Sequence, residues 1–101
     1  MKIPKRITVL GDVITVHQVD DKTIKKVAGE HDILGLAMLL EGKILLLKTL
    51  SNKEKHRVLI HEICHFVMYK TAANIGISGE LEEVVCQSFS TAFAQLGLNF
   101  K

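Results

Sequence analysis

The most hydrophobic segment of the chain, residues 58–69, is interrupted by three polar residues, His61, Glu62 and His65. Its apolar residues recur at intervals of three and four, which is typical of a helix with one face in a protein core. Burying a polar group without a partner is costly in free energy. A fold that buries this helix must therefore give the three polar side chains a partner, and a bound metal ion would be one.

Two pairs of short apolar segments precede this helix. Residues 7–10 and 13–19 are rich in Ile, Val and Thr and flank Gly11-Asp12, which predicts two strands joined by a tight turn. The runs 33–40 and 43–48 flank Glu41-Gly42, which predicts a second hairpin whose glycine has a positive φ angle. Residues 20–32 are predicted as a loop with one helical turn near residues 24–27. We therefore expect a small antiparallel sheet of three to four strands.

Two helices are expected after the sheet. Ser51 and Glu54 have the spacing of a capping box, which starts a helix of about twenty residues. Gly76 and Gly79 mark a loop, and an apolar stripe then predicts a second helix that ends near Gly97. The stripe consists of Leu81, Val85, Phe89, Ala92, Phe93 and Leu96. The fold class is α+β, and 101 residues fit one domain, residues 1–101.

Composition excludes several classes of protein. Lys plus Arg number 13 and Asp plus Glu 11, so there is no broad basic field for a nucleic acid. No apolar run approaches the roughly 20 residues of a membrane span, and the first residues lack the features of a secretory signal. A soluble, cytoplasmic protein is expected. In that compartment Cys64 and Cys86 should stay reduced and act as small hydrophobic residues.

The pentapeptide His61-Glu62-Ile63-Cys64-His65 carries the chemistry of the chain. Two histidines four residues apart lie on one face of a helix, close enough to share a metal ion. Glu62 lies about 100° around the helix from His61, where it can act as a general base without coordinating the metal. Two histidines and a third protein ligand, with one position left for water, would complete a catalytic zinc site.

The third ligand is expected from the acidic cluster Glu80, Glu82 and Glu83 at the start of the last helix. On these residues the chain resembles the gluzincin metallopeptidases, such as the thermolysin group, in which a second helix supplies a glutamate ligand. It resembles more closely the small ImmA/IrrE-type and related prophage-encoded metallopeptidases. The resemblance covers most of the chain and implies a minimal zincin: a short sheet, an HExxH helix and a glutamate-bearing helix.

The resemblance also bears on the choice between Glu82 and Glu83. In thermolysin-like second helices, apolar residues follow the ligand at offsets of two, six, nine and ten. Counted from Glu83, these offsets fall on residues that are more apolar than those counted from Glu82. We therefore favour Glu83 as the ligand and keep Glu82 as the alternative. At the offset of four, where thermolysin-like proteins have an acid that supports a histidine ligand, this chain has Gln87, whose amide could still accept the ring N–H.

What the resemblance implies is a zinc-dependent peptidase in which Glu62 is the general base. Its substrate would be a peptide or protein, such as a regulatory protein encoded nearby on a mobile element, lying along a sheet edge at residues 43–48 or 33–40. The alternative is a non-catalytic zinc-binding domain that acts through protein–protein contacts. Sequence alone does not define the oligomeric state. The candidates for stabilising an oxyanion are Tyr69, His17, His31 and His56, of which His56 is expected in solvent.

Overall fold

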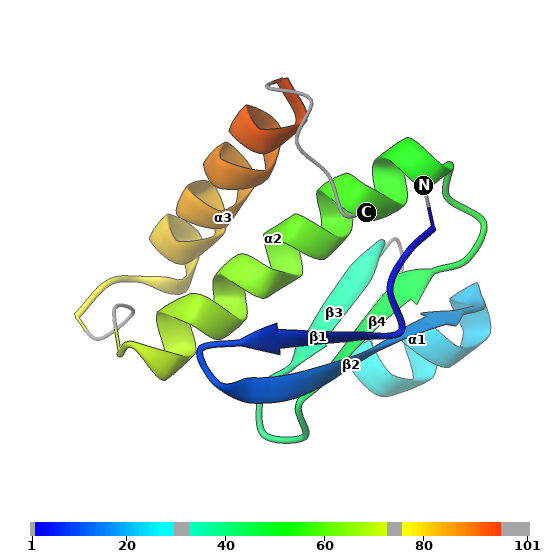
Figure 1. Cartoon of the computed structure of the whole chain (residues 1–101), viewed down its shortest axis with the longest axis horizontal. Helices are drawn as coiled ribbons and strands as arrows, with labels where there is room; N and C mark the ends of the chain where they lie inside the picture. The colour runs from blue at the N-terminus through cyan, green and yellow to red at the C-terminus, as the bar shows by residue number, and fades with distance from the viewer. Residues whose placement is uncertain (1, 30–32, 73–75, 96–101) are drawn as a thin grey trace.

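The computed structural model of the protein describes residues 2–29, 33–72 and 76–95. It has an α+β fold in which α2 crosses one face of a four-stranded sheet and α3 lies against α2 (Figure 1). None of the helices in these residues is both long and apolar enough to cross a membrane. The elements, in chain order, are β1 (Arg6–Val9), β2 (Asp12–Val19), α1 (Asp21–Ala28), β3 (Gly35–Met38), β4 (Lys43–Leu47), α2 (Asn52–Lys70) and α3 (Gly79–Gln95).

The sheet is mixed, with the strand order β1-β2-β4-β3. Both predicted hairpins are present: β1 pairs antiparallel with β2, and β3 pairs antiparallel with β4. The two hairpins meet through a parallel pairing of β2 with β4, so the prediction of an antiparallel sheet is wrong at its centre. A parallel pair needs a long crossover connection. Here that connection contains α1 and β3.

Helix α1 occupies most of a segment that was predicted to be a loop. Asp20 caps its first turn, accepting a hydrogen bond from the Thr23 backbone N–H at 2.8 Å. Gly29 ends the helix with φ of +74°, in the left-handed conformation that favours glycine. Ile24 is the buried residue of this short helix. The two caps and an apolar face formed by Ile24, Val27 and Ala28 therefore define α1, and the prediction of a loop missed this short amphipathic helix.

The turns and the cap of α2 follow local sequence rules. Leu10 and Gly11 both have positive φ, so the first tight turn lies one residue earlier than predicted, and Asp12 already belongs to β2. Gly42 has the predicted positive φ in the second hairpin. Ser51 caps α2 by accepting a hydrogen bond from the Glu54 backbone N–H at 3.2 Å. Helix α2 is 19 residues long, close to the predicted length.

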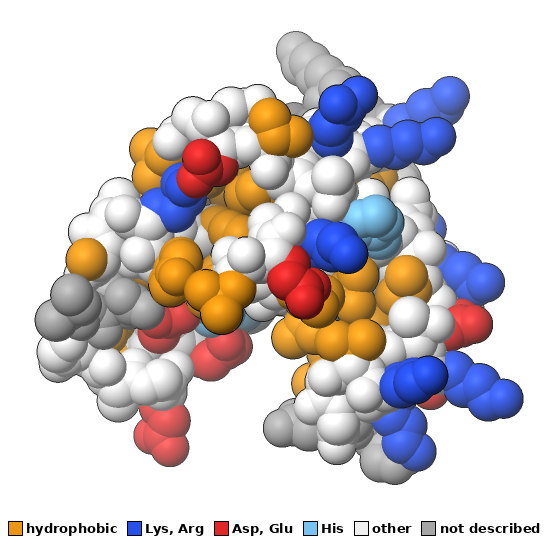
Figure 2. Space-filling view, turned by 90° about the horizontal axis from the view of Figure 1, so that it is seen from below, with side chains coloured by type: hydrophobic (Ala, Val, Ile, Leu, Met, Phe, Trp, Pro, Cys, Tyr) orange, Lys and Arg blue, Asp and Glu red, His pale blue; other side chains and the backbone are white. Residues whose placement is uncertain are grey.

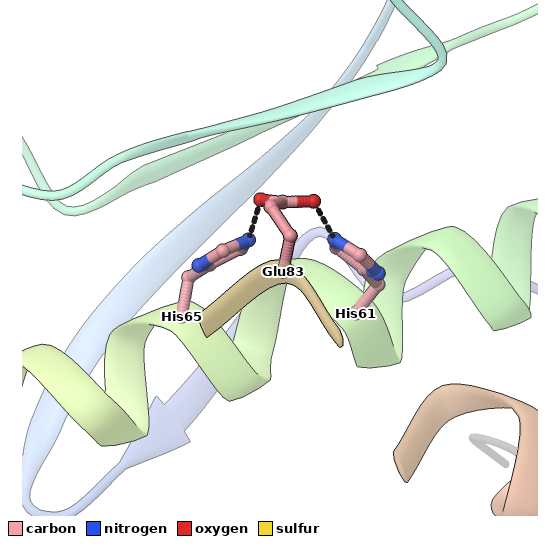
Figure 3. Close-up of side chains that lie close together, drawn as sticks. All are labelled: His61, His65 and Glu83. Atoms are coloured by element: carbon pink, nitrogen blue, oxygen red, sulfur yellow. Dashed lines mark hydrogen bonds and ion pairs between the residues drawn. The ribbon is translucent and has the colours of Figure 1, made fainter. Parts of the chain in front are cut away.

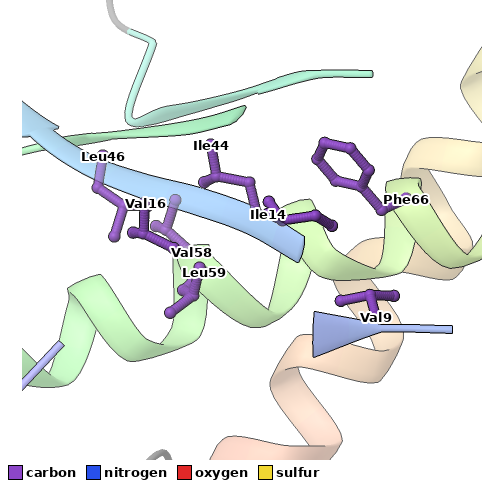
Figure 4. Packing of buried hydrophobic residues seen from close by; sticks show 8 residues of the cluster. All are labelled: Val9, Ile14, Val16, Ile44, Leu46, Val58, Leu59 and Phe66. Atoms are coloured by element: carbon purple, nitrogen blue, oxygen red, sulfur yellow. The ribbon is translucent and has the colours of Figure 1, made fainter. Parts of the chain in front are cut away.

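The hydrophobic core lies between the sheet and α2. Alternate residues of β2 and β4 point from the sheet toward α2, and Leu45, between two of them on β4, is buried as well, so β4 is covered on both faces. Residues 58, 59 and 66 of α2 fill the space opposite them (Figure 4). The cluster contains Val9, Ile14, Val16, Ile44, Leu46, Val58, Leu59 and Phe66.

Helix α3 does not bury the apolar stripe that was predicted to be its inner face. Leu81, Phe89 and Phe93 are 48%, 54% and 38% exposed, whereas Cys86 and Ser90 are fully buried. Small side chains let two helices approach closely, so α3 turns its cysteine and serine toward α2 and leaves its large apolar residues outside. The predicted stripe is wrong in its direction. The predicted helix end near Gly97 lies outside the described residues.

Gly35 lets the backbone of β3 lie close to the side chains of α2. A methyl group built on Gly35 would lie 2.5 Å from Val58 Cγ1 and 3.2 Å from the Leu45 carbonyl oxygen. Overpacking of this kind costs about 1–3 kcal/mol, so we expect Gly35→Ala to lower the free energy of unfolding by that amount in urea denaturation. Gly79→Ala is the control because its methyl group would meet no atom within 4 Å. Equal effects of the two changes would contradict this account.

Candidate metal centre

His61 and His65 lie side by side on the face of α2 that meets α3. Their ring centroids are 5.1 Å apart, with an angle of 64° between the ring planes. This proximity follows from their spacing of four residues on a regular helix. Burial lowers the pKa of His61, which favours the neutral imidazole that can bind a metal ion. The two rings can thus present their nitrogens to one point.

Glu83, on the first turns of α3, lies between the two imidazoles (Figure 3). One carboxylate oxygen is 3.2 Å from His61 Nε2, and the other is 2.7 Å from His65 Nε2. One ligand atom from each of the three residues lies within 4.8 Å of the others. His61, His65 and Glu83 therefore form a group that could hold a metal ion.

The spacing of these three donors suits a small tetrahedral ion. Zinc ligands of this type bind at about 2.0–2.2 Å, which separates two tetrahedral ligands by about 3.4 Å. The two nitrogen–oxygen distances in the structure, 3.2 Å and 2.7 Å, end on different oxygens of Glu83, and the three donor atoms lie within 4.8 Å of one another, so the side chains must adjust around an ion to reach that separation. Two imidazoles and a carboxylate also match the donor set of a catalytic zinc site, which keeps a fourth position open.

Glu82 contacts His65 on the other side of the ring from Glu83. Its carboxylate lies 2.5 Å from His65 Nδ1, on the side of the ring opposite Glu83. The Glu82 side chain is 17% exposed, compared with 62% for Glu83. A carboxylate in this position fixes the tautomer and the orientation of a metal-binding histidine. Gln87 hydrogen-bonds to His61 in a related manner, so each histidine has a partner from α3.

Glu62 is buried between α2 and the edge strand β3. Its carboxylate accepts a hydrogen bond from the backbone of Ala37. Burial raises the pKa of Glu62 to about 7, and the nearby Glu83 carboxylate raises this pKa as well. His65 and the Ala37 hydrogen bond act in the opposite direction. A carboxyl group with a pKa near neutrality can both accept and release a proton under physiological conditions.

A cleft of about 520 Å³ opens over these residues, between α2, α3 and β3. Figure 2 shows the hollow, with acidic side chains on its helical side. Strand β3 is the edge of the sheet on this side. Arg57 is the one Lys or Arg among the described lining residues, and Glu54 holds its guanidinium through hydrogen bonds of 2.7 Å and 3.2 Å. The lining includes Gly35, Leu36, Ala37, His61, Glu62, His65, Glu83 and Gln87.

Three of the residues considered for stabilising an oxyanion, Tyr69, His17 and His56, do not line this cleft. Tyr69 lines a different hollow beside Lys70, and His17 is exposed on β2, where it hydrogen-bonds to Thr15. His56 is buried, which corrects the expectation that it lies in solvent. His31 is outside the described residues. Sequence reasoning missed the contact of Glu82 with His65 and that of Ala37 with Glu62, for which no local sequence signal exists.

Compared with known proteins, the chain matches no family model, no curated protein and no solved structure. Its candidate centre is therefore interpreted from the geometry of its own residues.

Loss of the Glu82 carboxylate should weaken metal binding without removing a ligand. We expect Glu82→Gln to lower zinc affinity about 10–100-fold, because an amide supports the His65 ring less strongly than a carboxylate. Competition with a chromophoric chelator measures this affinity. Glu80→Gln is the matched control, since Glu80 is an exposed glutamate on the same turn of α3. A similar loss in both variants would point to the general charge of the helix end and contradict the specific contact.

The buried Glu62 carboxyl should make the stability of the metal-free protein depend on pH. Its pKa is about 4.5 unfolded and about 7 folded, so the folded state holds the proton more tightly. The contribution of Glu62 to stability is then fully present below pH 4.5 and is lost as the pH rises to 7. Relative to Glu62→Gln, the wild type should lose about 3 kcal/mol across this window in urea denaturation with a chelator present. Parallel pH curves for the two proteins would refute the assignment.

Proposed function

We propose that this protein is a zinc-dependent metallopeptidase with the architecture of a minimal zincin. The observation that carries the proposal is the convergence of His61, His65 and Glu83 in one cleft with the buried carboxyl of Glu62. Three ligands leave one coordination position for a reacting molecule, whereas structural zinc sites are usually closed by four protein ligands. The resemblance of the sequence to small gluzincin metallopeptidases supports the same proposal.

In this proposal Glu62 moves the proton in the reaction. A bound zinc ion would polarise the substrate carbonyl and make water a stronger acid. Glu62 accepts the proton of the attacking water on its carboxylate and then delivers it to the nitrogen of the departing amine. The Ala37 backbone hydrogen bond orients this carboxylate, and its pKa of about 7 suits both transfers. His61, His65 and Glu83 act as ligands.

The free edge of β3 is the proposed docking line for a peptide substrate. The Leu47 N–H donates a hydrogen bond to the Leu34 carbonyl at 2.9 Å. In an antiparallel pair every second residue is hydrogen-bonded to the neighbouring strand, so along β3 bonded and non-bonded residues alternate from Leu34. By this alternation, Gly35 and Ala37 turn their backbone polar groups away from β4 and toward the cleft, where the Ala37 N–H is the one that Glu62 uses. An extended peptide can pair with such an edge, next to Glu62. The substrate class is therefore a flexible segment of a protein, for which a regulatory protein is our candidate.

The test compares metal content and cleavage in three proteins made without a histidine tag. We expect native mass spectrometry to find about one zinc per chain in the wild type and in Glu62→Gln, and none in His65→Ala. The wild type should cleave members of an unstructured peptide library, and Glu62→Gln should be slower by about 100-fold or more. Glu41→Gln, in the β3–β4 turn, is the control that should keep both zinc and cleavage.

Each result decides between two functions. Zinc in the wild type with equal or no cleavage in all variants would favour a non-catalytic metal-binding domain that acts through protein contacts. No zinc in the wild type, even after zinc is added, would overturn both the peptidase and the metal-binding proposals.

A further inference from the structure

Three sulfur-bearing side chains meet where α2 packs against α3. Cys64 and Met68 are one helical turn apart on α2, and Cys86 comes from α3. Cys86 Sγ lies 3.9 Å from Met68 Sδ, and the Cys64 side chain is near enough to add to the effect of burial in raising the pKa of the Cys86 thiol. The described residues contain one other sulfur, that of Met38 on β3. Three of four sulfur atoms are thus gathered at one point.

This sulfur cluster, Cys64, Met68 and Cys86, is separate from the cleft that contains the histidines. None of its three residues lines that cleft. Cys86 is fully buried and Met68 nearly so, whereas Cys64 is partly exposed. The cluster therefore has a dry interior with a single thiol at its outer side. An ion could enter there without passing through the histidine site.

The spacing of Cys86 and Met68 suits a trigonal metal site. Three sulfurs bonded at about 2.3 Å, the length of metal–thiolate bonds, would lie about 4.0 Å apart around a central ion. The distance between Cys86 Sγ and Met68 Sδ is 3.9 Å. Thiolate and thioether sulfur are soft ligands that select copper(I) among the common cellular metals. We propose that Cys64, Met68 and Cys86 form a binding site for one copper(I) ion.

Both cysteines would bind as thiolates, because the thiolate is the form of cysteine that coordinates a metal ion. As the two sulfur–copper bonds form, Cys64 and Cys86 each release a thiol proton to solvent. Met68 binds as a neutral thioether donor. Zinc usually takes four ligands, so a site of three soft sulfur donors suits copper(I) better. The oxidation state of the metal does not change, so no further reactant is needed.

The test is a copper(I) titration of the full-length, fully reduced protein in the absence of oxygen, with bicinchoninate as the competing chelator. We expect about one copper(I) per chain to resist the chelator, with a thiolate-to-copper absorption band in the near ultraviolet. Cys64→Ser and Cys86→Ser should abolish this binding. Met68→Leu should weaken it by about tenfold or more, since losing even an outer partner of a metal ligand costs that much.

Controls separate this site from the histidine site and from unfolding. Met38→Leu changes the fourth sulfur, and His65→Ala removes a histidine, so both variants should bind copper(I) like the wild type. Cys64 is partly exposed and Met68→Leu is nearly isosteric, so these two variants test the site even where Cys86→Ser does not fold. Undiminished binding in Cys64→Ser and Met68→Leu, loss in His65→Ala, or no resistance to the chelator in the wild type would each overturn the proposal.

Discussion

Helix α2 packs on the sheet to form the hydrophobic core and also carries two residues of the candidate metal centre. The rest of the structure depends on this double role. One side of the helix places Val58, Leu59 and Phe66 against the sheet. The adjoining side faces α3 and places His61 and His65 against Glu83. Glu62 lies at the boundary between these sides, so its carboxylate is buried beside β3 and still reaches the cleft. A single helix thereby couples the packing of the sheet to the geometry of the centre.

Local chemistry explains the parts of the fold that the sequence predicts well. The Ser51 cap, the positive φ of Gly42 and the two hairpins each depend on a few neighbouring residues, so they can be inferred without knowing the rest of the fold. The parallel pairing of β2 with β4 depends instead on contacts between residues nearly thirty positions apart. The direction of α3 is likewise a tertiary effect: its apolar periodicity is real, but close approach to α2 is possible only on the side of Cys86 and Ser90.

In the candidate site, too, local features can be predicted from the sequence, whereas contacts between distant segments cannot. Helical periodicity alone brings His61 and His65 together. The apolar pattern used to choose Glu83 over Glu82 does not explain its place between the rings, because Phe89 and Phe93 of that pattern are exposed. The contact of Glu82 with His65 and the backbone contact of Ala37 with Glu62 join segments far apart in the chain. From the sequence alone, Cys64 and Cys86 are predicted to act as small hydrophobic residues. Their meeting with Met68 becomes visible only when the two helices are placed side by side.

The mixed sheet also has a consequence for the order in which the chain can fold. Each hairpin can form early because its strands are neighbours in sequence, but β4 must then insert beside β2 in parallel, which closes a long loop and is slow. Helix α2 packs mainly on the β3–β4 hairpin and α3 packs on α2, so these contacts join neighbouring elements of the chain and do not require that step. His61, His65 and Glu83 all come from α2 and α3, so a centre able to hold a metal ion would report the docking of these two helices and not the completion of the sheet.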